Sequence, residues 1–356
     1  MTILEDILGG ISAAGRRETR KVRVGILGEG PELALSASAL KSAPAVSSVV
    51  YYHPDPKKAA ANASALGLGS PASDIGELAS RVDAAQMLSF DGRTDAAESL
   101  LLSGKHVSIR KPLAETPEDA AALERAARRG KAFLRVDDEA FFFQPIVKLK
   151  HLVDSMEIGE ICAARFRVNI VGGGSLDPLK SILASSNYLL HPCFDCFAIA
   201  IHLFGDIESV IAYLNPMDMK RGGQGMVCCK FKDPGRYGVF ELTYSPEADI
   251  RADAYPCDFS IETAGTDGII WMNHFYGKMT ETPWIEVRRG KKYYSMGIGS
   301  GMEVSWASAL KESAAHFASR VARGGAPGPD IRAHARALKV LHASAESASA
   351  KKEIFI

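Results

Sequence analysis

The stretch VRVGILGEG at residues 22–30 constrains the fold most, because it joins a buried strand directly to a glycine-rich turn. Residues 22–27 form a continuous apolar run rich in β-branched side chains, as is typical of a strand in a parallel sheet that is covered on both faces. A helical stretch follows the turn, and further strands are indicated over 47–52, 82–90 and 105–110. Repeated strand–helix units of this length predict a parallel sheet with helices on both faces.

The pattern changes from about residue 160, where longer strands follow one another with only short turns between them. Turn signals such as DPG and RRGKK separate several of these strands. They predict a large, mostly antiparallel open sheet, followed by two helices over 302–322 and 329–347. The expected α/β organisation is an N-terminal extension (1–20), a Rossmann dinucleotide-binding domain (21–137) and a second α/β domain that includes both last helices (138–356).

Composition excludes several classes of function. Lys+Arg and Asp+Glu are balanced at 42 each, so no global field favours nucleic acid or an anionic membrane. No apolar run reaches the roughly 18–20 residues that would span a bilayer. The N-terminal residues carry their acidic side chains early and their arginines late, the reverse of a signal peptide, and the 6 cysteines do not form a disulfide scaffold. We therefore expect a cytoplasmic protein.

The glycine turn has the geometry that lets a backbone approach a pyrophosphate, with a helix N-terminus behind it. The fingerprint is incomplete: Leu33 follows Gly28 and Gly30 where a third glycine is usual, and Pro31 lies inside the loop. A tight strand–helix turn also needs glycine for purely structural reasons. At the end of the second strand, His53 replaces the carboxylate that normally binds the ribose of NAD. Either NADP is accommodated or dinucleotide affinity is low, and the sequence leaves both open.

The most specific signal is Lys111-Pro112, directly after the strand over 105–110. Ligands of open parallel sheets bind at the carboxyl ends of the strands. A partly desolvated lysine there can polarise a substrate hydroxyl or carbonyl. A solvated turn lysine is the alternative interpretation.

Several segments together resemble the Gfo/Idh/MocA oxidoreductases, from about residue 21 to the end. They are the Gly-x-Gly turn, GKHVSIRKPLAETPEDAAAL, FLRVDDEAFFFQPIVKLKHLVDSMEIGEI and the C-terminal GGAPGPDIRAHARALKVLHASAESASAKKEIFI. The resemblance implies hydride transfer between NAD or NADP and an alcohol or carbonyl of a sugar-like, cyclitol or hydroxy-acid molecule. It gives Lys111 the position of the family's catalytic lysine. Arg110 stands where the family has glutamate, which reverses the local charge.

The family's second motif, Asp-x-x-x-His before a helix, falls on His191 and Asp195 with the two residue types exchanged. Spacing of four places both on one face of a helical turn. Asp195 would then be the base and His191 would orient it. A carboxylate is a weak base at its reference pKa of about 4, and Lys111 and Arg110 would lower that pKa further.

Three other interpretations of this segment remain. A metal site could use His191, Asp195 and Cys193, although the sequence offers no separated partner spacing, and we predict no metal. Cys193 and Cys196 form a C-x-x-C, but they lack a thioredoxin-like context. Ordinary core packing is the third.

The site residues expected from the sequence fall into three groups. The catalytic candidates are Lys111, Asp195 and His191. The cofactor-binding candidates are Gly28, Glu29, Gly30, Pro31, His53, Ser89, Arg110 and Lys111. The substrate candidates are Arg251 and Tyr255, which with Arg110 would suit a substrate that carries a carboxylate or phosphate.

The leading prediction is an NAD- or NADP-dependent oxidoreductase that acts on a small molecule. The departures at positions 53, 110, 191 and 195 also permit a non-redox lyase or isomerase, or a ligand-binding protein that uses little or no cofactor. The resemblance further implies a homodimer or homotetramer formed through the C-terminal sheet.

Overall fold

The computed structural model describes residues 20–30, 32–171, 193–215, 223–245, 247–248, 257–275, 282–297, 299–325 and 331–356. The chain divides into two compact units. The first comprises Met1–Phe142 and Ala307–Ala335, and the second comprises Phe143–Trp306 and Arg336–Ile356. The sequence placed a single boundary at 137/138 and both last helices in the second domain. In the structure, helix α10 (Trp306–Ala322) instead falls almost entirely in the first unit.

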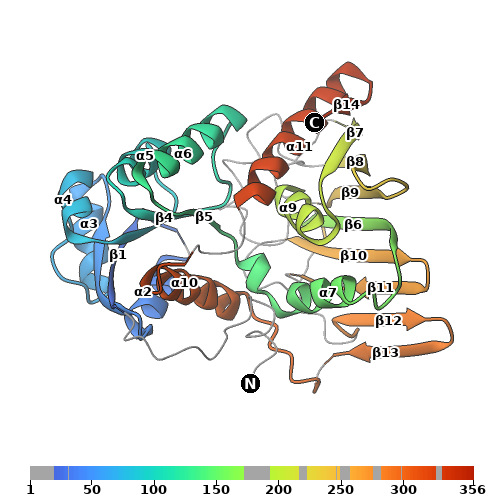
Figure 1. Cartoon of the computed structure of the whole chain (residues 1–356), viewed down its shortest axis with the longest axis horizontal. Coiled ribbons are helices and arrows are strands. Elements are labelled where there is room, and N and C mark those ends of the chain that lie inside the picture. Colours follow the sequence, from blue (N-terminus) through green and yellow to red (C-terminus); the bar gives the residue numbers. More distant parts are fainter. Residues whose placement is uncertain are drawn as a thin grey trace. The chain divides into compact units, whose positions relative to one another are not determined.

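The described part of the first unit contains a five-stranded parallel sheet in the order β2-β1-β3-β4-β5 (Figure 1), as the strand–helix repeats predicted. Its strands are β1 (Val22–Leu27), β2 (Val46–Tyr52), β3 (Ala84–Met87), β4 (His106–Arg110) and β5 (Leu134–Asp137). The helices that precede α10 are α2 (Leu33–Ser42), α3 (Pro56–Ala65), α4 (Ile75–Arg81), α5 (Arg93–Leu102), α6 (Pro117–Gly130) and the short 3₁₀ helix η1 (Glu139–Phe142).

Helix α10 belongs to the first unit because its apolar face completes the core of that unit. Ala314 and Phe317 of α10 pack in one buried cluster with Ile26 of β1 and Leu40 of α2. Figure 1 shows α2 and α10 on one side of the sheet and α5 and α6 on the other. Burying a side chain the size of Phe317 contributes about 1.5–3 kcal/mol to the attachment of this helix, which comes from far along the sequence.

Two helices of this unit begin at local signals in the sequence. The Asp55 carboxylate accepts hydrogen bonds from the first backbone amides of α3, and the Thr116 hydroxyl accepts one from the Asp119 amide in α6. Pro56 and Pro117 occupy the first turns, where a missing N–H is harmless. Both features direct the chain from the carboxyl end of a strand into the next helix.

The second unit contains a nine-stranded sheet in the order β13-β12-β11-β10-β6-β9-β8-β7-β14, in which β6 and β9 are parallel and the other neighbours antiparallel. The strands are β6 (Ile161–Val171), β7 (Ile207–Leu214), β8 (Gly223–Phe231), β9 (Tyr237–Ser245), β10 (Cys257–Gly265), β11 (Gly268–Met272), β12 (Ile285–Arg289), β13 (Lys292–Met296) and β14 (Ile354–Phe355). The helices are α7 (Gln144–Asp154), α9 (Cys193–Phe204) and α11 (Ile331–Ala350), of which α11 begins in the first unit.

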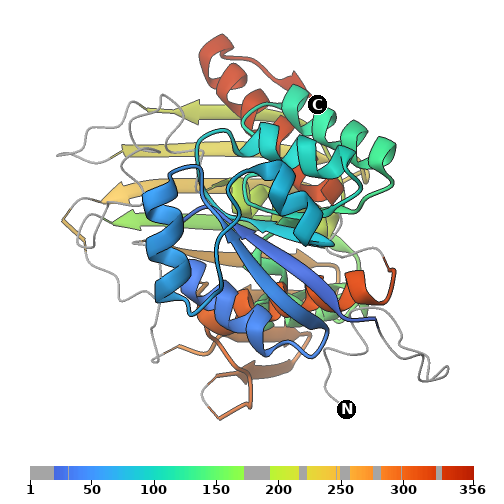
Figure 2. The ribbon, with the colours of Figure 1, turned by 90° about the vertical axis from the view of Figure 1, so that its left-hand side faces the viewer.

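The two faces of this sheet differ. On one face Phe197 of α9 packs edge-on against Phe240 of β9, and Phe240 stacks on Phe166 of β6. On the other face Tyr213 and Tyr237 are 61% and 55% exposed. Figure 2 shows several of these strands side by side in one layer. Among the described residues, helix α9 therefore packs on one face of the sheet, while side chains of the opposite face are exposed. The large, mostly antiparallel sheet itself was predicted.

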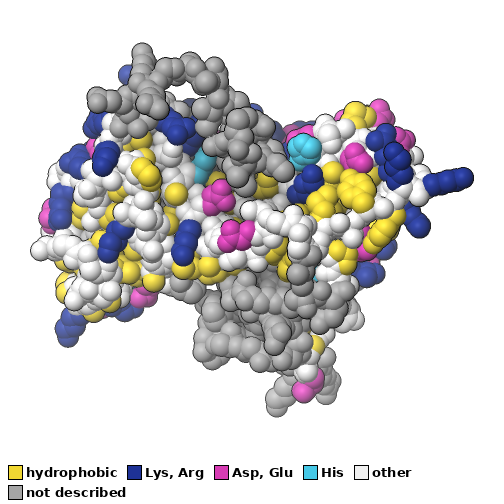
Figure 3. All heavy atoms as spheres, turned by 90° about the horizontal axis from the view of Figure 1, so that it is seen from below, with side chains coloured by type: hydrophobic (Ala, Val, Ile, Leu, Met, Phe, Trp, Pro, Cys, Tyr) yellow, Lys and Arg dark blue, Asp and Glu magenta, His cyan; other side chains and the backbone are white. Residues whose placement is uncertain are grey.

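Charge is mixed on one face of the molecule. On the face drawn in Figure 3, the described residues present both basic and acidic side chains among apolar ones. Among the residues that the structure describes, no helix has the length and apolar character needed to cross a membrane.

Candidate active site

The turn between β1 and α2 has a backbone geometry that favours glycine. Gly28 has a φ of 93° and Gly30 a φ of 137°, a region that L side chains rarely adopt. A Cβ at position 28 would lie 2.7 Å from the carbonyl oxygen of Ser89, so the turn packs tightly beside the end of β3. The Tyr51 hydroxyl donates a 2.7 Å hydrogen bond to the Gly28 carbonyl. A glycine turn fixed in this way at the carboxyl end of β1 fits the pyrophosphate of a dinucleotide.

Glu29 forms the middle of this turn and is held through both its backbone and its side chain. Its amide donates to the Ser89 carbonyl at 3.0 Å, and the Ser89 amide donates back at 3.3 Å. Lys58 Nζ lies 2.9 Å from one Glu29 carboxylate oxygen and 3.0 Å from the other. His53, buried at the end of β2, places Nε2 3.7 Å from the Glu29 carboxylate. Five of the predicted cofactor residues thus lie together, namely Gly28, Glu29, Gly30, His53 and Ser89, whereas Pro31 lies outside the described residues.

Arg110 is buried among carboxylates. Its Nε lies 3.3 Å from Glu32 Oε1, and its Nη1 pairs with Glu139 and donates at 3.2 Å to the Asp137 carbonyl. Glu32 directly precedes α2 and comes close to Gly30, so Arg110 links the end of β4 to the glycine turn. The charge reversal expected from the sequence at position 110 is therefore balanced by two glutamates.

Lys111 follows β4 at the same edge of the sheet, and its bond to Pro112 is cis. Its Nζ lies 2.9 Å from Asp138 Oδ1 and 3.1 Å from Glu139 Oε1. The other oxygen of Asp138 lies 3.0 Å from Nε2 of the fully buried His334 in α11. Lys111 is therefore not a solvated turn residue; its ammonium is held in place by two carboxylates.

These carboxylates are ionised at neutral pH. Burial alone would raise the pKa of Glu139, but Arg110 and Lys111 outweigh burial and lower it to about 2. Burial would likewise raise the pKa of Asp138, yet Lys111 and His334 hold it well below its usual value. A pair of ionised carboxylates favours the charged form of a neighbouring lysine, which can then donate hydrogen bonds to an oxygen that becomes negative during a reaction.

The structure describes only part of the predicted His191/Asp195 motif. Asp195 lies in the first turn of α9 and is half-buried. Its partner His191 lies outside the described residues, as do the substrate candidates Arg251 and Tyr255. Within the described ranges, no group of three or more His, Cys, Asp or Glu side chains is arranged to hold a metal ion.

Sequence reasoning missed four residues of this site: Glu32, Asp138, Glu139 and His334. Two of them had a readable signal, because LRVDDE places carboxylates at the carboxyl end of the strand beside β4, where Asp137 is paired with Arg110. His334 had no such signal, because it is 196 residues away from Asp138 in sequence.

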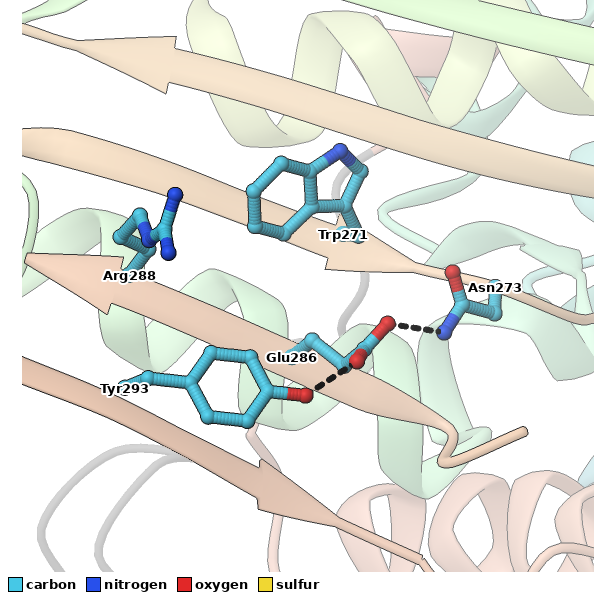
Figure 4. A pocket seen from close by; sticks show the side chains of 5 residues that line it. All are labelled: Trp271, Asn273, Glu286, Arg288 and Tyr293. Atoms are coloured by element: carbon cyan, nitrogen blue, oxygen red, sulfur yellow. Dashed lines mark hydrogen bonds between the residues drawn. The ribbon is translucent and has the colours of Figure 1, made fainter.

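A separate hollow lies in the second unit, on the open face of β11, β12 and β13 (Figure 4). It is lined by Trp271, Asn273, Glu286, Arg288 and Tyr293. Glu286 joins two neighbours, accepting a 2.9 Å hydrogen bond from Asn273 and another from the Tyr293 hydroxyl. Polar groups that bond one another in this way make an ordered patch of sheet surface.

Comparison with known families identifies the class of fold. Residues 22–138 match the model of the Gfo/Idh/MocA family, an oxidoreductase family with an NAD-binding Rossmann fold. A segment of 65 residues is 38% identical to 1-carboxy-3-chloro-3,4-dihydroxycyclohexa-1,5-diene dehydrogenase of Comamonas testosteroni. That segment spans 18% of this chain and only 16% of the relative.

Solved structures of low sequence identity share the fold over almost the whole chain. An oxidoreductase from Agrobacterium radiobacter in complex with NAD⁺, L-tartaric acid and magnesium has a TM-score of 0.79 at 18% identity, over 94% of this chain and 98% of that one. Levoglucosan dehydrogenase in complex with NADH and levoglucosan has 0.77 at 19%, over 95% and 100%. An NAD-binding oxidoreductase from Klebsiella pneumoniae has 0.76 at 19%, over 94% and 99%.

Proposed function

We propose that this protein is an NAD-dependent dehydrogenase or reductase that acts on a CH–OH or carbonyl group of a sugar-like, cyclitol or hydroxy-acid substrate. One observation carries the proposal: Lys111 lies at the sheet edge that also holds the glycine turn, with its Nζ fixed by Asp138 and Glu139. The family of the Rossmann residues supports the cofactor. The ligands named for similar folds, levoglucosan and L-tartaric acid, support a small polyhydroxylated substrate.

The proposed chemistry divides between cofactor and protein. Bound NAD would accept or supply the hydride. Lys111 would donate a hydrogen bond to the reacting oxygen and stabilise its developing negative charge. In the direction of oxidation the substrate hydroxyl also loses a proton, and we assign its transfer to Asp195 assisted by His191.

The first test combines thermal unfolding in NAD, NADH, NADP and NADPH with a screen of polyols, sugars and hydroxy acids for NAD reduction. We expect a nicotinamide nucleotide to raise the unfolding temperature and a member of the panel to be oxidised as NAD is reduced. If no nucleotide stabilises the protein, the proposal fails. Substrate conversion without net NAD reduction would instead indicate a lyase or isomerase, and ligand stabilisation without turnover a binding protein.

We also propose that the open sheet face mediates self-association. Tyr213, Glu241 and Arg167 are linked in register across β7, β8, β9 and β6, so they share this face with the exposed Tyr237. Exposed tyrosines among charges of both signs are typical of a protein interface. Light scattering should give a dimer or tetramer that Tyr237→Glu dissociates, and a monomeric wild-type protein would overturn this proposal.

The cytoplasmic location stays a prediction from the sequence.

A further inference from the structure

Glu29 provides a carboxylate where the end of β2 lacks one. In a Rossmann fold the adenosine ribose is normally bound by an acidic residue at the end of the second strand. Here that position is His53, a side chain that is only 6% exposed. The Glu29 side chain is 45% exposed and lies 3.7 Å from His53 Nε2, so it presents a carboxylate beside the same position, from the turn and not from the strand.

The surroundings of Glu29 fix this carboxylate. Its backbone is locked to Ser89 by two hydrogen bonds, and the adjoining Gly28 carbonyl accepts the Tyr51 hydroxyl. His53 Nδ1 accepts the Asp55 amide at 3.0 Å, which leaves the proton of a neutral imidazole on Nε2, the nitrogen that faces Glu29. The Glu29 carboxylate is thus accessible to a ligand while its position is determined by β1, β2 and β3.

The charge at this place favours a ribose without a phosphate. The Lys58 ammonium contacts both oxygens of the Glu29 carboxylate. The positive charge of Lys58 is therefore already balanced by Glu29. A 2′-phosphate would approach an ionised carboxylate, whereas a ribose hydroxyl can donate a hydrogen bond to it.

From these contacts we infer that Glu29 replaces the missing strand-end carboxylate as the acceptor for the adenosine ribose hydroxyls, and that the protein therefore selects NAD over NADP. The inference rests on the proposed function, since it concerns the same cofactor site. It differs from both possibilities that the sequence left open at His53, NADP binding and low dinucleotide affinity, and assigns the selectivity to a residue of the glycine turn.

The test is calorimetric titration of the full chain with ADP-ribose and with 2′-phospho-ADP-ribose, which needs neither substrate nor turnover. The wild-type protein should bind ADP-ribose the more tightly. Hydrogen bonds to a charged group contribute about 1.5–3 kcal/mol, so Glu29→Gln should weaken the binding of ADP-ribose by about 10- to 100-fold. The binding of 2′-phospho-ADP-ribose should be unchanged or tighter.

Two controls accompany this titration. The double variant Glu29→Gln/His53→Asp, which returns a carboxylate to the strand end, should recover part of the lost affinity for ADP-ribose. Nicotinamide mononucleotide, which lacks the adenosine ribose, should not distinguish Glu29→Gln from wild type.

The outcomes separate this inference from the proposed function. If wild type binds the phosphorylated ligand better, or if Glu29→Gln leaves the ratio of the two affinities unchanged, the assignment of Glu29 is wrong while the dehydrogenase proposal stands. If wild type binds neither ligand, both fail. Thermal unfolding of each variant in the absence of ligand checks that the exposed substitution at position 29 leaves the fold intact.

Discussion

Two networks of buried charge lie side by side in the first unit, and they differ in what completes them. In the first, Arg135 of β5 contacts Asp137, and Ser313 of α10 donates a 2.6 Å hydrogen bond to the same carboxylate; Arg135 and Asp137 are fully buried. In the second, Lys111 contacts Asp138 at the end of the sheet and keeps 9% of its side chain exposed. Closed on all sides, the first network holds α10 on the sheet. The second lies at the edge where ligands of this fold bind.

Asp137 is the last residue of β5, and Asp138 follows it at the edge of the sheet. Asp137 and Asp138 are neighbours in sequence, yet the first accepts hydrogen bonds from Gln86 and Ser313 inside the core, and the second faces Lys111.

Arg110→Glu should cause the largest loss of stability. It removes the cation between Glu32 and Glu139 and places a third carboxylate against them. Breaking a buried ion pair costs about 3–5 kcal/mol, and the added repulsion increases that cost. Urea unfolding measures this loss. The control is Arg81→Glu, at a partly exposed ion pair within α4, which should change stability much less. A stable Arg110→Glu protein would mean that the cluster is not as closely coupled as its contacts indicate.

Asp137→Ala should come next. Burial lowers the pKa of Arg135 to about 10, so the guanidinium stays charged at neutral pH and would lose its carboxylate partner. We expect a loss of about 3–5 kcal/mol in the free energy of unfolding. The matched control is Asp83→Ala, whose partner Arg23 is near the surface, at about 1 kcal/mol. Equal losses in the two variants would mean that the fully buried pair of Arg135 and Asp137 contributes no more to stability than an ion pair near the surface.

His316→Gln should change the pH dependence of stability and little else. Burial, followed by the charges of Arg135 and Arg320, lowers the pKa of His316 to about 4. Because the folded pKa lies below the unfolded value, the stabilising contribution is complete above about pH 6.5 and is lost as the pH falls toward 4. Urea midpoints measured between pH 4 and 7 should therefore decline less steeply in His316→Gln. His151→Gln, at an exposed position, should keep the wild-type slope.

Much of the fold was predictable because it rests on local patterns. The strand over 22–27 coincides with β1, and β6 begins at Ile161, where longer strands were expected from about residue 160. Both are apolar or alternating runs, which is the most readable pattern in a sequence. The two-residue strand β14 had no such pattern; it exists because the C-terminus pairs with β7. The place of α10 was equally hidden, because an amphipathic helix does not specify which apolar face it will cover.

The candidate site was predictable to the extent that it lies on strand ends. Lys111 and the glycine turn follow buried strands, and position in a parallel sheet brings such residues to one edge. The balance of charge was not predictable, because Glu32, Asp138 and His334 come from separate elements that only tertiary packing brings to Arg110 and Lys111.

We propose that Lys111, Asp138 and Glu139 belong to a catalytic site for hydride transfer, and the rate of NAD reduction by Lys111→Met at saturating nucleotide tests this directly. Loss of a positioned proton or hydrogen-bond donor should lower kcat by about 10²- to 10⁴-fold, while the Kd for NADH stays close to that of wild type. An unchanged kcat in a correctly folded Lys111→Met protein would contradict the catalytic role of Lys111 and would mean that its role is structural.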